Sequence, residues 1–203
     1  MKMLAAVVML VALAGSACLG GGSAARTTES STGATAAHSP VRWQRFADST
    51  VAFRYPSTWR RYRWQFDTSF SNALVYLSTA REHDPCVTTT TKSSETTRCT
   101  SALARLEPSG VYVTWVQWGM PAMSYKHFPG KPTRIGGRPA RIHVGRADRD
   151  CAHLGGQETI DAHISSRVAG DNWTAMIACL RGPNLATSKA QVEHMLATTT
   201  WVS

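Results

Sequence analysis

The stretch "PTRIGGRPARIHVG", residues 132–145, predicts the element around which the fold is organised, a β-hairpin. Two glycines, Gly136 and Gly137, stand between two extended arms, and a tight two-residue hairpin turn requires a positive φ at both central positions. In the second arm, apolar and polar residues alternate over positions 140–144, which is typical of a strand with one buried face. The stretch therefore predicts two antiparallel strands joined by a glycine turn.

Other segments also have the composition of strands. They are residues 51–59, 73–80, 111–119, 158–167 and 173–181. The first alternates apolar and polar residues as far as Pro56, where the missing N–H ends the pairing ladder. The others are rich in β-branched and aromatic residues, which favour strands. Because the connections between these segments are short, the sequence predicts an antiparallel sheet.

One helix is expected near the C-terminus. Ser188 with Gln191 three residues later has the pattern of a capping box, in which each side chain satisfies the other residue's backbone N–H. Val192, Met195 and Leu196 then follow at the spacing of one apolar helix face. The predicted fold class is α+β, a single domain in which an antiparallel β-sheet is flanked by a C-terminal amphipathic helix.

Three short motifs carry a resemblance to a known family. They are "FRYPSTW" at 53–59, "IGGRPARI" at 135–142 and "MLATTTWV" at 195–202. Together they resemble the PsbP-like domains and the LpqN-type lipoproteins of actinobacteria over roughly residues 50–202. The resemblance implies an antiparallel sheet flanked by helices and a non-catalytic role beside membrane-associated machinery or in the cell envelope. A cysteine-bounded insertion after residue 85 departs from the family pattern, and no functional residue transfers from it.

The N-terminus has the pattern of a secretory signal over residues 1–17. Lys2 precedes an apolar run at 3–14, which is shorter than the roughly 20 residues that span a bilayer. Small residues then follow at 15–17. The sequence therefore predicts export and removal of this segment.

Cys18 is the predicted site of lipidation, because the segment before it resembles the signal of bacterial lipoproteins, with Ala17 immediately before the cysteine. Gly15 stands where that motif usually has Leu, Val or Ile, so plain secretion remains an alternative. The next residues are mostly Gly, Ser, Thr and Ala, a composition typical of a tether. The expected organisation is a signal peptide at 1–17, a lipidated cysteine and tether at 18–40, and a globular domain at 41–203. We expect the domain to be held at the extracytoplasmic face of the cell membrane.

Arginines account for much of the formal net charge of +9. Six of them lie in one segment: Arg42, Arg45, Arg54, Arg60, Arg61 and Arg63. An exported protein rarely meets nucleic acid, so we expect an anionic membrane or wall polymer as the partner, with Arg60, Arg61 and Arg63 in contact with it. The alternative is a basic face that contacts only solvent.

The remaining four cysteines form an even set in an exported chain, which indicates disulfides. Cys86 and Cys99 bracket a polar loop, and this pairing leaves Cys151 with Cys179. A tight hairpin at Gly155 would hold the second pair too far apart, so we expect residues 148–156 to cross the sheet edge as a loop. The alternative for this region is a metal site formed by Cys151, His153, Asp161 and His163.

No catalytic signature appears in the sequence, and no cofactor or resident metal is expected. The predicted function is a lipid-anchored, non-catalytic binding or assembly module of the bacterial cell envelope. Its expected partners are the cytoplasmic membrane and an unknown envelope protein or polymer. One alternative is an envelope enzyme with a site assembled from His143, Asp161 and His163, and another is a carrier of an apolar ligand.

Overall fold

The computed structural model describes most of the chain from Pro40 onwards. The described residues are 40–63, 67–68, 70–84, 86–99, 102–120, 122–166 and 172–202. Cys18, the signal peptide and the tether before Pro40 lie outside them. Strands make up 50% of the described residues and helices 14%, so the fold is mainly antiparallel β with a C-terminal helix. No helix in this part of the chain combines the length and apolar character needed to cross a bilayer.

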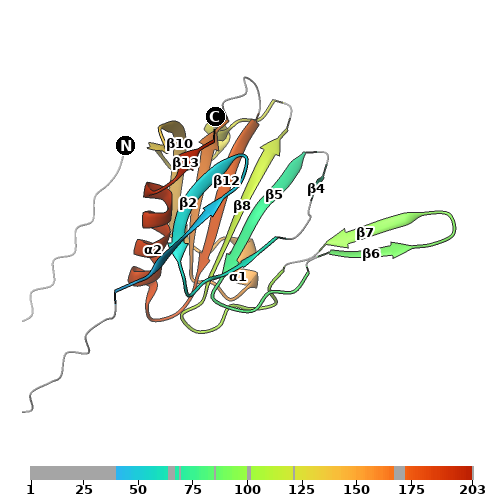
Figure 1. The fold of residues 1–203 in the computed structure, drawn as a ribbon, viewed down its shortest axis with the longest axis horizontal. Helices are drawn as coiled ribbons and strands as arrows, with labels where there is room; N and C mark the ends of the chain where they lie inside the picture. The colour runs from blue at the N-terminus through green and yellow to red at the C-terminus, as the bar shows by residue number, and fades with distance from the viewer. Residues whose placement is uncertain are drawn as a thin grey trace, which may run out of the picture. The chain divides into compact units, whose positions relative to one another are not determined.

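The largest element is an eight-stranded sheet in which every pair is antiparallel (Figure 1). Its main path runs β3 (Arg60–Tyr62), β5 (Ser71–Ser78), β8 (Val111–Gly119), β12 (Asn172–Leu180), β11 (Glu158–Ser165), β10 (Arg138–Arg146) and β9 (Lys131–Ile135), and β4 (Asp67–Thr68) pairs with β5. The predicted strands at 51–59, 73–80, 111–119, 158–167 and 173–181 are confirmed within a few residues.

One face of the large sheet is covered by a small sheet and a helix that lie side by side (Figure 1). The small sheet has the order β1 (Trp43–Ala47), β2 (Val51–Pro56) and β13 (Thr200–Trp201), and the helix is α2 (Leu185–Ala197). Phe53 of β2 stacks on Trp115 of β8, with ring centroids 4.8 Å apart. Both side chains are fully buried, so this face holds the main hydrophobic core.

The glycine turn predicted between β9 and β10 is confirmed. Gly136 and Gly137 have φ values of 56° and 81°, the positive φ that a two-residue hairpin requires. Gly136 is constrained a second way, because a Cβ there would lie 2.6 Å from Trp201 Nε1. That nitrogen donates a hydrogen bond to the carbonyl oxygen of Ile135 at 3.0 Å. The turn therefore also anchors β13 at the C-terminus.

The helix α2 begins one turn earlier than predicted, and the capping box at Ser188 was wrong. The N-cap is Asn184, and Ser188 is buried inside the helix, where its backbone N–H donates to the carbonyl oxygen of Asn184 at 3.0 Å. Gly182, with a φ of 104°, turns the chain out of β12. Leu185 then packs against the main core, so the first turn is held by apolar contact rather than by a capping side chain.

The polar loop predicted between Cys86 and Cys99 is instead a β-hairpin of β6 (Cys86–Thr90) and β7 (Glu95–Cys99). Threonine is β-branched and favours extended backbone, and the hydroxyls of Thr88 and Thr97 lie 2.9 Å apart across the two strands. Figure 1 shows the hairpin projecting from the large sheet. Cys86 is disulfide-bonded and lies opposite Cys99, whose side chain is outside the described part, so their pairing stays a prediction.

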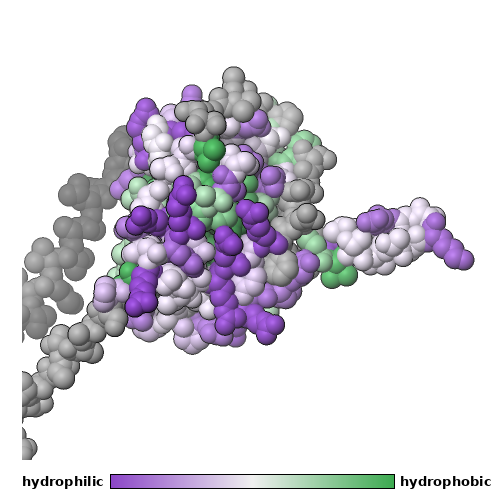
Figure 2. All heavy atoms as spheres, viewed as in Figure 1, coloured by the Kyte–Doolittle hydropathy of each residue, from purple (hydrophilic) through white to green (hydrophobic). Residues whose placement is uncertain are grey.

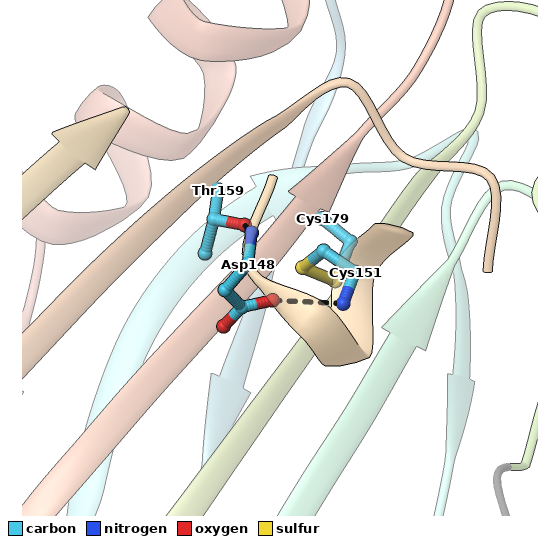
Figure 3. The surroundings of a disulfide bond; sticks show 4 residues. All are labelled: Asp148, Cys151, Thr159 and Cys179. Carbon is cyan, nitrogen blue, oxygen red and sulfur yellow. Dashed lines mark hydrogen bonds between the residues drawn. A yellow bond between two sulfur atoms is a disulfide. The ribbon is translucent and has the colours of Figure 1, made fainter. Parts of the chain in front are cut away.

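The predicted disulfide between Cys151 and Cys179 is confirmed, but the route of residues 148–156 was wrong. They form a short helix, α1 (Arg149–His153), capped by Asp148, whose Oδ1 accepts a hydrogen bond from the backbone N–H of Cys151 at 2.8 Å (Figure 3). The backbone N–H of Asp148 donates to Thr159 Oγ1 at 3.0 Å. Because β11 lies between β10 and β12, the helix crosses β11 over the second face of the sheet, not around its edge.

A smaller core lies beneath α1 on this second face. Its buried residues are Tyr76, Ala80, Ala102, Leu103, Leu106, Tyr112, Cys151, Leu154 and Cys179. The Cα atoms of the bridged cysteines are 5.2 Å apart, which suits a disulfide without backbone movement. The bridge thus fixes α1 onto β12 within an apolar cluster.

We predict that replacing Cys151 and Cys179 by Ala together lowers the free energy of unfolding by about 3–4 kcal/mol. The bridge closes a loop with a sequence separation of 28, and the chain-entropy model gives this magnitude for a loop of that length. The measurement is equilibrium urea unfolding of the wild type and the double variant.

The matched control replaces Cys86 and Cys99 by Ala. The hairpin supplies no residue to either core, and Val87 is 66% exposed, so without its bridge the hairpin can open while both cores stay folded. We therefore expect the free energy of global unfolding to fall by less than about 1 kcal/mol, below the roughly 3 kcal/mol that the chain-entropy model gives for a hairpin that stays closed. Equal losses in the two double variants would contradict the structural role given to the bridge under α1.

Candidate functional site

The outer side of the small sheet displays arginines. Arg45 on β1 lies directly opposite Arg54 on β2, and both are exposed, because the neighbouring pair Phe46 and Phe53 points inward. Figure 2, drawn from the same side as Figure 1, shows strongly hydrophilic side chains gathered over the region of β1 and β2. The strand pairing therefore places two positive charges side by side on the surface.

Two further arginines lie beside this pair. Burial raises the pKa of the Tyr55 hydroxyl, and the positive charge of Arg61 nearby partly offsets that rise. The guanidinium carbon of Arg63 lies 5.9 Å from the ring centroid of Phe46, which places this exposed side chain against β1. We call the four exposed arginines on and beside the small sheet, Arg45, Arg54, Arg61 and Arg63, the arginine face.

The predicted trio of Arg60, Arg61 and Arg63 is divided by the strand. Successive side chains of a strand alternate between its faces, so in β3 Arg60 points away from Arg61. All three are exposed. The sequence-based prediction joined neighbours along the chain, whereas strand pairing brings together Arg45 and Arg54 from two different strands.

Within the described residues, no ion pair joins a carboxylate to the arginine face. Lys189 Nζ pairs with Glu158 Oε1 at 3.3 Å, and neither residue belongs to this surface. None of the described carboxylates pairs with Arg45, Arg54 or Arg61. The face therefore presents uncompensated positive charge, which suits an anionic contact surface.

The second face of the large sheet carries a hollow of about 730 Å³ beside α1. Its apolar lining comes from Tyr112, Leu154, Ile177 and Cys179, and its polar lining includes Asp148, Arg149, Asp150 and His153. Thr114 completes it. Figure 3 shows Asp148 and the disulfide of Cys179 at this position. Such a mixed lining suits binding of a small molecule better than it suits further core packing.

Asp161 lies next to this hollow. It is directly opposite His143 on β10 and Ile177 on β12, and Ile177 lines the hollow. Burial raises the pKa of Asp161 to about 6, the negative charge of Asp148 adds to the rise, and the positive charge of His143 opposes it. Asp161 can therefore exchange a proton near neutral pH.

His163 lies two residues further along β11 and behaves in the opposite way. Its side chain is buried, and burial lowers its pKa to about 4, so the ring is neutral at physiological pH. The ring of Phe128 stacks on it with centroids 3.6 Å apart and planes 3° from parallel. His143, Asp161 and His163 thus lie on the second face of the large sheet, but Asp161 and His163 have different neighbours and opposite pKa shifts.

The arrangement has no partner for nucleophilic catalysis. Among the described residues, no hydroxyl or thiol hydrogen bonds to Asp161 or His163, whereas an activated nucleophile requires such a contact. The alternative metal site is not assembled either, because the sulfur of Cys151 is bonded to Cys179. No group of three His, Cys, Asp or Glu side chains within the described ranges is placed to hold a metal ion.

No protein-family model, no curated protein and no solved structure matches this chain. The resemblance to PsbP-like domains and LpqN-type lipoproteins therefore stays a prediction. Function has to be inferred from the arginine face and the hollows themselves.

The shifted pKa values of Asp161 and His163 predict opposite effects on stability over the same pH range, about 4 to 6.5. The folded state holds a proton on Asp161 more tightly than the unfolded chain does, so this group makes stability fall as pH rises from about 4 to 6. The unfolded chain binds a proton on His163 more readily, so stability falls as pH drops from 6.5 to about 4. After allowance for solvent screening, each contributes about 1–2 kcal/mol.

We therefore expect Asp161→Asn to lose stability on acidification from pH 6.5 to 4 more steeply than the wild type. His163→Phe, which keeps a ring against Phe128, should gain stability over the same range. The measurement is the free energy of unfolding in urea at several pH values. The charge control is Glu193→Gln, at an exposed position of α2. Parallel pH profiles for all four proteins would show that neither group titrates as described.

Proposed function

We propose that this protein is a lipid-anchored, non-catalytic binding module of the bacterial cell envelope whose arginine face contacts anionic headgroups. One observation carries the proposal: four exposed arginines lie on or beside the small sheet, and in the described part of the chain none of them pairs with a carboxylate. Guanidinium groups bind phosphate oxygens through paired hydrogen bonds, which gives this surface a preference for phosphate-bearing lipids.

The strength of such a contact follows from its charge. A basic residue close to an anionic leaflet gains about 1 kcal/mol, so four arginines gain about 4 kcal/mol, which corresponds to a dissociation constant of about 1 mM. The attraction decays over a Debye length of about 8 Å at physiological ionic strength. The arginine face alone would therefore bind membrane only transiently.

A lipid on Cys18 would change this balance. Roughly 22 residues separate Cys18 from Pro40, and a chain of that length spans at most ~75 Å. A linker of this size gives an effective concentration of about 1 mM, which matches the affinity estimated for the face. The anchor thus supports a module that rests on the membrane for part of the time and is free for the remainder.

The point where the tether joins the domain also supports an orientation with the arginine face toward the membrane. The described part begins at Pro40, and β1, which carries Arg45, begins at Trp43. A lipid anchor would therefore pull on the strand that displays the arginine face. The other expected partner, an envelope protein or polymer, would then meet the surfaces that face away from the membrane.

The first prediction of this proposal concerns the anchor. Replacing Cys18 by Ala should release the protein from the membrane fraction into the medium, since the remaining electrostatic contact is weak and reversible. Immunoblotting of fractionated cells measures the distribution. Retention of Cys18→Ala at the wild-type level in the membrane fraction would contradict lipid anchoring.

The second prediction concerns the arginine face, tested in the secreted Cys18→Ala chain. Replacing Arg45, Arg54, Arg61 and Arg63 by Gln should weaken binding to phosphatidylglycerol vesicles at least tenfold, because most of the attraction comes from these charges. Wild-type binding should fall steeply with added salt, and binding to phosphatidylcholine vesicles should be weak throughout. Vesicle sedimentation across a salt series gives these affinities.

A charge-matched control replaces exposed basic residues outside the face, Lys92, Arg98, Lys131 and Arg146, by Gln. This control has the same net charge as the variant of the arginine face. If the position of the charges determines binding, it should retain most of the wild-type affinity. Equal losses in the two variants would show that net charge, and not this surface, drives binding.

A further inference from the structure

A second, smaller hollow of about 310 Å³ lies at the end of the large sheet where β8 ends and β5 and β12 begin. In Figure 1 this is the end to which the arrowhead of β8 points. The hollow has no part in the arginine face and no residue in common with the hollow beside α1. A volume of this size is at the lower end of the range for small-molecule sites.

Three primary amides meet in this hollow. Asn72 on β5 is directly opposite Gln117 on β8, and Asn172 on β12 is directly opposite Gly119. Each amide offers two N–H donors and one carbonyl acceptor. Within the described residues, nothing hydrogen bonds to these three side-chain amides, so their donors and acceptors are open to solvent or to a ligand.

Gly119 permits this arrangement. A Cβ at this position would lie 2.7 Å from Oδ1 of Asn172, closer than side-chain carbons come to oxygen without displacing it. The amide of Asn172 therefore occupies the space above a residue with no side chain. The backbone N–H of Gly119 donates to the carbonyl oxygen of Phe70 at 2.9 Å, which closes the adjacent wall.

One exposed aromatic side chain stands beside the amides, because Phe70 is 51% exposed and lines the hollow. Trp118 and Trp173 also border the hollow and stack on each other with planes 13° from parallel. Strand alternation turns both indoles to the opposite face of the sheet from Gln117, so they support the floor of the hollow from behind. An aromatic face packs against the C–H groups of a ring, while amides bond the hydroxyls at its edge.

The charge of the hollow narrows the ligand class. In a chain with a formal net charge of +9, none of the described residues that line this hollow is charged. A phosphate or carboxylate ligand would find no counter-ion among them. A neutral polyol would instead exchange its hydrogen bonds to water for hydrogen bonds to the amides and hydroxyls of the lining, at little cost in free energy. From the three amides, the exposed ring of Phe70 and the uncharged described lining, we propose that this hollow binds a neutral, hydroxyl-rich sugar ring.

The test uses the secreted Cys18→Ala chain on an array that carries neutral oligosaccharides and oligosaccharides containing uronic acids. At least one neutral glycan should be bound, and the double variant Asn72→Ala, Asn172→Ala should bind it at least tenfold more weakly. In an NMR titration with that glycan, the side-chain amide signals of Asn72, Gln117 and Asn172 should shift. Binding confined to uronic acid glycans, or to no glycan, would overturn the proposal.

Two further variants separate the site from general effects. Asn184→Ala with Gln191→Ala removes two accessible amides around α2 and should leave glycan binding unchanged. Gly119→Ala removes no amide but displaces that of Asn172, so it should weaken binding at least threefold with little change in melting temperature. Equal binding by the Asn72, Asn172 double variant and the wild type would also overturn the proposal.

Discussion

The stack of Phe53 on Trp115 is the contact on which the arrangement of the molecule depends. It joins the small sheet to the centre of the large one, and both side chains are withdrawn from water. Burial of two such side chains contributes several kcal/mol, far more than any exposed ion pair in this fold. Arg54 and its partner Arg45 are displayed on the outer side because the opposite side of β2 is held by this apolar contact. One side of β2 thus carries an exposed charge, and its other side packs in the core.

The second face of the large sheet is organised by a covalent bond. The disulfide holds α1 over β11, and the helix brings Asp148 close enough to raise the pKa of Asp161. Phe128 covers His163 further along the same strand and removes it from water. The shifted pKa values on this face are thus consequences of how the sheet is covered, and they do not by themselves indicate catalysis.

Local signals in the sequence predicted local structure well. The glycine pair predicted the β9–β10 turn because positive φ is a property of single residues. The turn before β2 had a signal that was missed: Asp48 Oδ1 accepts hydrogen bonds from the backbone N–H groups of Thr50 and Val51, at 2.7 Å and 2.9 Å. The same holds for α1, where Asp148 is the N-cap and Gly155 has a φ of 76° after the helix.

Features set by pairing between distant strands could not be read from the sequence. Arg45 and Arg54 form a pair only because β1 folds back on β2, and Asn72 meets Gln117 only through the register of β5 with β8. Ser188 was misplaced because tertiary contact of Leu185 starts the helix earlier than capping preference does. The disulfide partner of Cys151 was found by elimination, but its path over the sheet needed the strand order.

The β6–β7 hairpin has a consequence for the integrity of the chain. Its exposed tip at Lys92 lies between two strands that pair only with each other in the described structure, and Cys86 at its base is in a disulfide opposite Cys99. A protease that cuts at the tip would cut the backbone of a hairpin that supports neither core. If the bridge joins Cys86 to Cys99, the two fragments stay covalently linked. In that case a cut at the tip divides the polypeptide without dividing the molecule.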